Sequence, residues 1–160
     1  MSSTRYGTPA LLRGGILCLV LLGPLACGGD DGTGPADADV SGTWSATVAD
    51  LTGGGSSCSS TDPTSLTLTQ TGGTFSGSYS GGEVACTGSS GTFSFPVGSG
   101  AVVNGTVNGA SVSFDLDSPD FHQSGTVNGS SMSGPATWNC FFGPATGVVT
   151  LTGTWHAARQ

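Results

Sequence analysis

Positive charge is almost absent from this chain. Its 160 residues include no lysine and three arginines, against ten aspartate and glutamate residues. Arg5 and Arg13 lie near the N-terminus, so the rest of the chain carries a single basic residue and is strongly acidic. A protein with so little cationic surface does not bind the phosphate backbone of nucleic acids, and we exclude nucleic acid as a partner.

Long hydrophobic runs are absent as well. A membrane-spanning helix takes about 20 apolar residues, and no run in this chain approaches that length. The longest run, residues 16–22, is uncharged and follows the two N-terminal arginines. A basic head, a short apolar run and the small residue Ala26 are typical of a secretory signal peptide, which we predict over residues 1–26. The exported remainder keeps all ten acidic residues and one arginine, a formal charge of −9.

The residues Leu25-Ala26-Cys27 resemble the lipobox of bacterial lipoproteins, although Pro24 stands where that pattern has leucine. In this family, diacylglycerol alkylates the cysteine that follows the cleavage site. The resemblance implies that Cys27 carries a lipid that anchors the protein to a bacterial membrane. Residues 28–39 contain no large apolar side chain, so we predict lipid attachment and a flexible acidic tether over residues 27–39. The following domain would face the periplasm or the cell exterior.

Cysteine is scarce after this point, with Cys58, Cys86 and Cys140 only. An exported protein can form disulfides. A hairpin that turns at Gly72-Gly73 places residues 58 and 86 nearly opposite one another. We therefore predict a Cys58–Cys86 disulfide and a free, buried Cys140.

Constellations that carry catalysis or bind metals are also scarce. The two histidines, His122 and His156, lie far apart in the sequence, and no Gly-x-Ser-x-Gly motif lies between a strand and a helix. We expect no enzymatic activity and no cofactor. One local group of carboxylates could bind calcium or could be a solvated acidic rim. It consists of Asp115, Asp117 and Asp120.

From Val40 onward, apolar and polar residues alternate with period two, which is the pattern of strands with one buried face. Val40, Trp44 and Val48 share one parity, whereas serines and threonines occupy the other, and the pattern recurs as far as Trp155. Glycine-containing pairs, typical of tight hairpins, separate the runs at 72–73, 108–109 and 128–129. Residues 40–160 are therefore predicted to form one all-β domain, an antiparallel up-and-down meander of about eight or nine strands.

Closing such a meander into a barrel removes its edge strands, and a β-sandwich is the alternative. Gly42-x-Trp44 on the first strand, with Arg159 near the end of the last, resembles the lipocalin and avidin-like barrels. Those barrels bind small molecules in their mouths. The resemblance implies that Arg159 lies over Trp44 at the closed end in a cation–π contact.

Large aromatic residues of the inward parity are candidates to line either a ligand site or a packed core. They are Trp44, Phe75, Tyr79, Phe114, Phe121, Trp138 and Trp155. Glycines share this face, either to let the strands bend sharply or to leave room for a ligand. An eight-stranded barrel is narrow, so we expect a mostly filled interior with at most a shallow pocket at one mouth.

Two functions are compatible with this sequence. The first is a monomeric, lipid-anchored, lipocalin-like module that binds a small apolar or amphipathic molecule. The second is a packed structural or interaction domain of the cell envelope that has no small-molecule ligand. The volume left inside the barrel and at its mouth discriminates between them.

Overall fold

A computed structural model describes residues 36–89, 91–117, 120–141 and 147–160. The predicted signal peptide, Cys27 and most of the predicted tether lie outside these residues. The described residues belong to one unit, Gly34–Gln160. None of them forms a helix long and apolar enough to cross a membrane.

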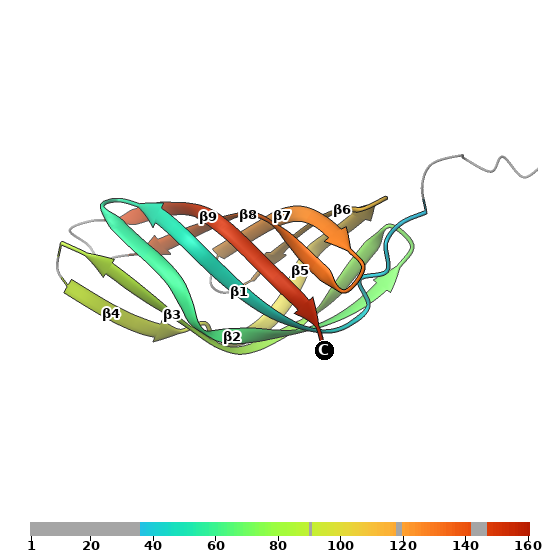
Figure 1. Ribbon diagram of the computed structural model, residues 1–160, viewed down its shortest axis with the longest axis horizontal. Helices are drawn as coiled ribbons and strands as arrows, with labels where there is room; N and C mark the ends of the chain where they lie inside the picture. The colour runs from blue at the N-terminus through green and yellow to red at the C-terminus, as the bar shows by residue number, and fades with distance from the viewer. Residues whose placement is uncertain (1–35, 90, 118–119, 142–146) are drawn as a thin grey trace, which may run out of the picture. The chain divides into compact units, whose positions relative to one another are not determined.

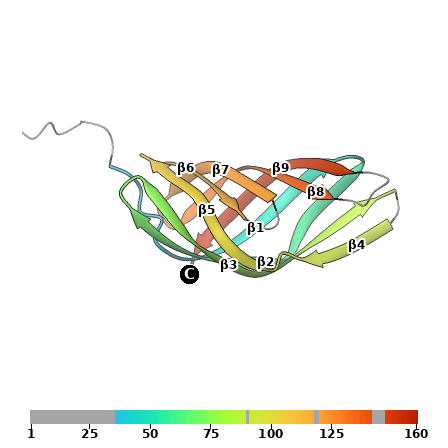
Figure 2. The same cartoon turned by 180° about the vertical axis from the view of Figure 1, so that it is seen from behind.

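The described residues form nine strands joined by antiparallel pairings (Figure 1). The strands are β1 (Gly42–Gly53), β2 (Ser56–Thr71), β3 (Thr74–Gly88), β4 (Gly91–Pro96), β5 (Ser99–Asn108), β6 (Ser111–Leu116), β7 (Asp120–Asn128), β8 (Ser131–Phe141) and β9 (Val148–Arg159). β9 pairs with both β8 and β1, and β2 pairs with both β1 and β3, so eight strands close into a barrel (Figures 1 and 2). The short strand β4 is the ninth and pairs with β3. The predicted all-β meander and the closed barrel are confirmed, and the β-sandwich alternative is wrong.

The period-two alternation identifies the core because side chains of one parity point into the barrel. All seven aromatic candidates for the lining are buried. Phe93 and Phe95, which the alternation also predicts to face inward, are exceptions: Phe93 is exposed and Phe95 is half-buried, because β4 lies at the edge of the wall. Several pack edge to face: the ring centroids of Phe75 and Phe114 are 5.7 Å apart, and those of Phe114 and Trp155 are 5.2 Å apart. Such contacts between aromatic rings stabilise the core beyond the burial of apolar area.

The alternation predicts the wrong face at one position of β5. Val103 has the parity of Gly105 and Val107, yet Val102 is the residue buried in the core. The register between β5 and β6 shifts between Val103 and Thr106, and Asn104 there has a φ of +54°. A β-bulge of this kind inserts one extra residue and reverses the parity before it.

The predicted hairpin turn at Gly72-Gly73 is confirmed, whereas the turns predicted at 108–109 and 128–129 each lie one residue later. Asn108 pairs with Ser111, so Gly109 and Ala110 form the two-residue loop between β5 and β6. Gly109 has a φ of +57°. Glycine at the first central position is typical of a type II′ turn, which matches the right-handed twist of the two strands of a hairpin.

Inward glycines allow neighbouring strands to approach closely and do not open a ligand cavity. A Cβ atom on Gly77 would lie 2.0 Å from the carbonyl oxygen of Thr67. A Cβ atom on Gly105 would lie 2.2 Å from the carbonyl oxygen of Phe75 and 2.7 Å from the Phe75 ring. Backbone atoms of the neighbouring strand occupy the space beside both glycines, and the Phe75 ring also covers Gly105. The glycines therefore have a structural role and do not leave room for a ligand.

The barrel has two different ends. At one, which we call the closed end, lie the turns β2–β3, β5–β6 and β7–β8, together with the C-terminus. Residues 37–41 cross this end before β1 begins: the backbone N of Ala38 donates to the carbonyl of Gly109, and that of Val40 donates to Oε1 of Gln70. We call the opposite end, where β1–β2, β3–β4 and β8–β9 connect, the mouth.

The wall of the barrel is incomplete at the mouth because β4 and β5 are two halves of one long strand. Glu83 pairs with Pro96 and Ser80 pairs with Ser99, so both halves keep one register against β3. The lower half, β5, also pairs with β6, but among the described strands β4 has only β3 as a neighbour. The wall is therefore split at the mouth, between β4 and the ends of β7 and β8.

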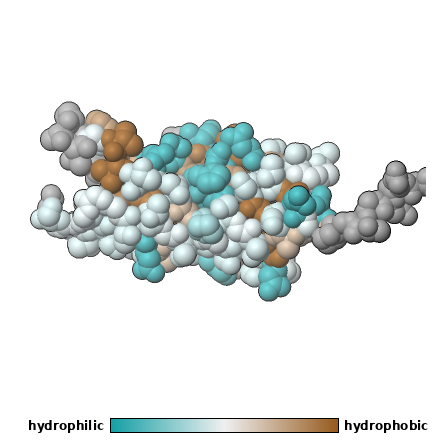
Figure 3. Space-filling model, turned by 90° about the horizontal axis from the view of Figure 1, so that it is seen from above, coloured by the Kyte–Doolittle hydropathy of each residue, from teal (hydrophilic) through white to brown (hydrophobic). Residues whose placement is uncertain are grey.

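The outer face of the domain carries small polar side chains and glycine. The face shown in Figure 3 is mostly pale, the colour of residues of intermediate hydropathy, and a brown patch lies at the mouth end. The large hydrophobic residues exposed among those described are Phe93, Phe141 and Val148. They lie on β4, at the end of β8 and at the start of β9, so all three belong to the mouth.

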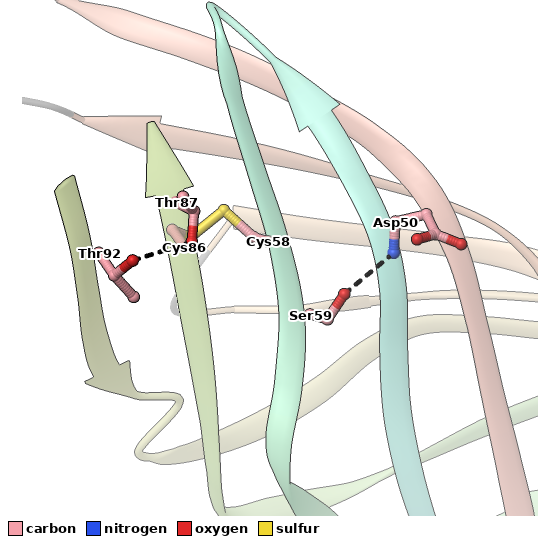
Figure 4. The surroundings of a disulfide bond; sticks show 6 residues. All are labelled: Asp50, Cys58, Ser59, Cys86, Thr87 and Thr92. Carbon is pink, nitrogen blue, oxygen red and sulfur yellow. Dashed lines mark hydrogen bonds between the residues drawn. A yellow bond between two sulfur atoms is a disulfide. The ribbon is translucent and has the colours of Figure 1, made fainter. Parts of the chain in front are cut away.

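A disulfide joins the long hairpin β2–β3 near the mouth (Figure 4). Cys58 and Cys86 are register partners, their Cα atoms are 4.0 Å apart, and both are buried, which confirms the predicted pair. Hydrogen bonds of hydroxyl groups link this hairpin to β1 on one side and to β4 on the other. Ser59 Oγ accepts from the backbone N of Asp50 on β1, and the hydroxyl groups of Thr87 on β3 and Thr92 on β4 are hydrogen-bonded at 3.1 Å.

Replacing both Cys58 and Cys86 by alanine is expected to lower the free energy of unfolding by about 3–4 kcal/mol, because the bond removes loop-closure entropy from the unfolded chain. Urea unfolding followed by tryptophan fluorescence measures the change. Cys140→Ala is the matched control, since it removes a buried thiol and no cross-link. A loss in the double variant no larger than that in the control would contradict the prediction.

Candidate ligand site at the mouth of the barrel

The closed end is filled by the protein itself. Val40 is fully buried there, and Nε1 of Trp44 donates to its carbonyl oxygen at 2.9 Å. The guanidinium of Arg159 lies 4.5 Å from the centre of the Trp44 ring and donates to the carbonyl oxygens of Ser41 and Asp39. The cation–π contact that the lipocalin resemblance implied is present, so Trp44 and Arg159 seal this end and do not line a site.

Side chains pack the middle of the barrel, and a cavity of about 30 Å³ lies among those of the described residues. This volume has room for one or two water molecules. Its walls come from β1, β2, β3, β6, β7 and β8, and its lining includes Gln123 and Trp138. The interior itself is therefore too small for most organic ligands.

Two polar atoms beside this cavity have no hydrogen-bond partner among the described residues. They are Oε1 of Gln123 and Nε1 of Trp138, in residues that are 4% and 5% exposed. Gln123 pairs with Ala136 across β7 and β8, so Trp138 lies two residues further on the same face. A buried polar atom left unpaired costs about 1–3 kcal/mol. A group that donates to Gln123 and accepts from Trp138, such as a hydroxyl group or water, would recover that energy.

A larger hollow, of about 280 Å³, lies at the mouth where the wall is split. We call it the mouth groove. It is lined by Phe93, Phe95, Asp120, Trp138, Asn139, Cys140 and Phe141. Its volume is close to the lower limit of about 300 Å³ for small-molecule sites. Trp138 lines both hollows, so the groove and the small cavity meet at one side chain.

Aromatic rings from opposite sides of the split define the groove. The ring centroids of Phe95 on β4 and Trp138 on β8 are 4.9 Å apart, and Phe121 on β7 packs against Trp138 at 5.5 Å. At the rim, Phe93 and Phe141 are 39% and 68% exposed. An exposed apolar patch beside a concave surface is a feature of binding sites in otherwise polar proteins.

One polar chain of hydrogen bonds crosses the rim of the groove. Nδ2 of Asn139 donates to Oδ2 of Asp120 at 2.9 Å, and the hydroxyl of Thr150 donates to Oδ1 of Asn139 at 2.8 Å. Asp120 is the only charged residue among those that line the groove. The carboxylate is therefore held in place at the edge of an aromatic surface.

Cys140 lines the groove but is not a nucleophile. It is a free, buried cysteine, as predicted, and burial raises the pKa of its thiol to about 12. The thiolate is the reactive form, so a thiol with this pKa is inert at neutral pH.

The candidate calcium ligands Asp115, Asp117 and Asp120 do not come together in the structure. Asp117 accepts a hydrogen bond from the backbone N of Ala101, whereas Asp120 accepts from Asn139. Within the described part of the chain, no group of three or more acidic, histidine or cysteine side chains could hold a metal ion. The strand pairing directs each carboxylate to a different neighbour, which sequence proximity alone does not reveal.

Asp115 is instead held on the outer face by two side chains. Nδ2 of Asn104 donates to one carboxylate oxygen at 2.8 Å, and Nδ1 of His122, on β7, lies 2.5 Å from the other. Partial burial raises the pKa of Asp115, but the hydrogen bonds from Asn104 and His122 and the charge of His122 outweigh it. The net result is a pKa below the usual value for aspartate.

Asp115→Asn is expected to lower the free energy of unfolding by about 0.5–1 kcal/mol at pH 7, the range for solvent-screened pairs. Because the folded-state pKa is depressed, this contribution is complete above the unfolded-state pKa of about 3.9. It is lost as the pH falls through the lower folded-state pKa. Urea unfolding between pH 7 and pH 2 measures it, with Asp62→Asn as the control for loss of one exposed carboxylate. A difference that persists at pH 2 would contradict the assignment.

Comparison with protein-family models, with curated protein sequences and with solved structures finds no match to this chain. An aromatic groove of ligand size opens at a split in the barrel wall, and a single carboxylate marks its rim. Behind it, Gln123 and Trp138 present one unpaired acceptor and one unpaired donor to a cavity of about 30 Å³.

Proposed function

We propose that this protein is a lipid-anchored lipoprotein of the cell envelope whose barrel binds a small apolar or amphipathic molecule at its mouth. The observation that carries the proposal is the mouth groove with Trp138 at its base. The groove offers aromatic surface of ligand size, and the unpaired Nε1 of Trp138 has no use in a fully packed core. Apolar walls with a few convergent polar groups are characteristic of small-molecule sites.

The dimensions of the two hollows limit the ligand. A volume of about 280 Å³ accommodates one or two rings or a short branched chain. A polar group of the ligand that reaches past Trp138 would meet Oε1 of Gln123 in the smaller cavity. Alternatively, a water molecule in that cavity would bridge the polar group and Gln123. We therefore expect an amphipathic molecule whose apolar body lies between Phe95 and the end of β8.

The anchoring part of the proposal is supported by where the chain enters the domain. Residues 37–41 cross the closed end, opposite the mouth (Figure 1). Nine residues separate Cys27 from Asp37, so the two can be at most about 36 Å apart when the segment is fully extended. A lipid on Cys27 would attach the domain to the membrane through the closed end, within the reach of this tether. The Cys58–Cys86 disulfide is compatible with export.

A second candidate function is a packed structural or interaction domain without a ligand. The observation that favours it is the interior itself, where the cavity lined by Gln123 and Trp138 measures only about 30 Å³. In this case the groove would be a surface irregularity, and an apolar probe would bind it no better than it binds the exposed patch around it.

Cys27→Ser is expected to release the protein from membrane pellets into the soluble fraction, because the lipid needs the thiol for attachment. The measurement is fractionation of cells that express each form, followed by mass analysis of the N-terminal peptide. Cys140→Ser, which removes a thiol within the domain, is the control and should stay with the membrane. Retention of the Cys27→Ser protein on the membrane would argue for a different anchor.

The uncharged fluorescent probe N-phenyl-1-naphthylamine is expected to bind the purified domain with one-to-one stoichiometry and to quench tryptophan fluorescence. Phe95→Ala should weaken binding by about fivefold or more, since it removes one wall of the groove. Val148→Ala is the matched control, because Val148 is exposed at the mouth and does not line the groove. Equal weakening by both changes, or no uptake at all, would favour the packed structural domain.

A further inference from the structure

The charge of the mouth differs from that of an ordinary apolar pocket. Arg159 is the only lysine or arginine among the described residues, and it is fixed over Trp44 at the closed end. The mouth therefore presents no cationic side chain within the described part of the chain. It does present Asp120 at the rim of the groove, in a protein whose acidic residues outnumber its basic residues ten to three.

The carboxylate at the rim is positioned and has capacity for a ligand. Asn139 donates to Oδ2 of Asp120 and is itself fixed by Thr150. Among the described residues, Oδ1 of Asp120 accepts no hydrogen bond, so it can face a cation. A neutral ligand would make no use of this charge, and an anionic ligand would be repelled by it.

The aromatic residues beside this carboxylate supply a second feature that cations prefer. Phe93 and Phe95 on β4 and Trp138 on β8 bring three ring systems to one groove, with Phe141 at the rim. The faces of aromatic rings carry negative electrostatic potential and attract ammonium groups, most strongly in the case of tryptophan. Rings combined with one carboxylate are the usual way in which proteins bind substituted ammonium groups, because such groups are large and weakly hydrated.

We propose that the mouth groove binds a small organic cation, a substituted ammonium compound, against the aromatic surface formed by Phe93, Phe95 and Trp138 and beside the carboxylate of Asp120. The inference rests on the proposed function and names the chemical class of its ligand. Behind Trp138, the unpaired Oε1 of Gln123 and Nε1 of Trp138 accept and donate one hydrogen bond each. A hydroxyl group meets both requirements, so an amino alcohol complements the groove and the small cavity together.

Choline and its uncharged isostere 3,3-dimethylbutan-1-ol test the proposal, since both carry the same hydroxyl and differ in one atom, N⁺ against carbon. We expect choline to bind at least about fivefold more tightly, as followed by tryptophan fluorescence and by NMR titration at constant ionic strength. Equal affinities for the two compounds would overturn the inference.

Asp120→Asn should weaken choline binding by about threefold to fivefold and leave the affinity for the alcohol unchanged. Asp62→Asn removes the same net charge from β2, outside the groove, and is the matched control. Phe95→Leu keeps apolar volume but removes a ring face, so it should reduce the preference for choline over the alcohol. If Asp62→Asn and Asp120→Asn weakened choline binding equally, the net charge of the protein alone would explain the loss, and the inference would be overturned.

The outcomes separate this inference from the function on which it rests. If N-phenyl-1-naphthylamine binds in a manner that depends on Phe95 but choline is not preferred, the groove is a ligand site and the cation inference is wrong. If neither the naphthylamine nor choline binds, the proposed function itself fails. Thermal unfolding of each variant, compared with the unmodified protein, shows whether a lost affinity reflects lost folding.

Discussion

The hydrogen bonding of strand edges is the constraint on which the rest of this structure depends. Every strand of a barrel needs a partner on each side, and eight strands satisfy this requirement around the closed half. The strands differ in length, however: β2 and β3 have 16 and 15 residues, whereas β6 has six. The part of β3 near the mouth therefore pairs with β4, but β6 is too short to continue the wall on the other side of β4. The split at the mouth follows from this difference in strand length.

The split exposes aromatic side chains to water at the mouth. Behind them, it leaves polar atoms buried, where water has little access. In a uniformly closed barrel, the rings of Phe93 and Phe95 would be ordinary core, and the buried polar atoms would be paired. Here Gln123 and Trp138 remain buried with unpaired atoms next to a groove that opens to solvent. Buried polar groups without partners are destabilising, so a site that pairs them transiently is the simplest reason for their presence.

Much of this fold could be predicted from sequence because period-two alternation and hairpin register act locally. The alternation placed Trp44, Phe114 and Trp155 in the core, and counting back from Gly72-Gly73 paired Cys58 with Cys86. The bulge at Asn104 could not be predicted, since any of several polar residues in that strand could take a positive φ. A shallow pocket at one mouth of the barrel is expected from the sequence, but its place and lining could not be predicted, because the groove joins β4 to β8 through differences in strand length that no local pattern records.

The seam of the barrel has a consequence for the order in which the chain acquires its structure. β1 pairs with β9 from Trp44–Arg159 to Thr52–Thr152, so the two strands that close the wall are separated by almost the whole domain. The β2–β3 hairpin needs only neighbouring residues and can form as soon as they are available. Closure must wait for the C-terminal strand, and contacts between such distant residues slow folding. A chain that emerges N-terminus first therefore carries β1 with one unsatisfied edge until its final residues arrive, which is the interval in which aggregation competes with folding.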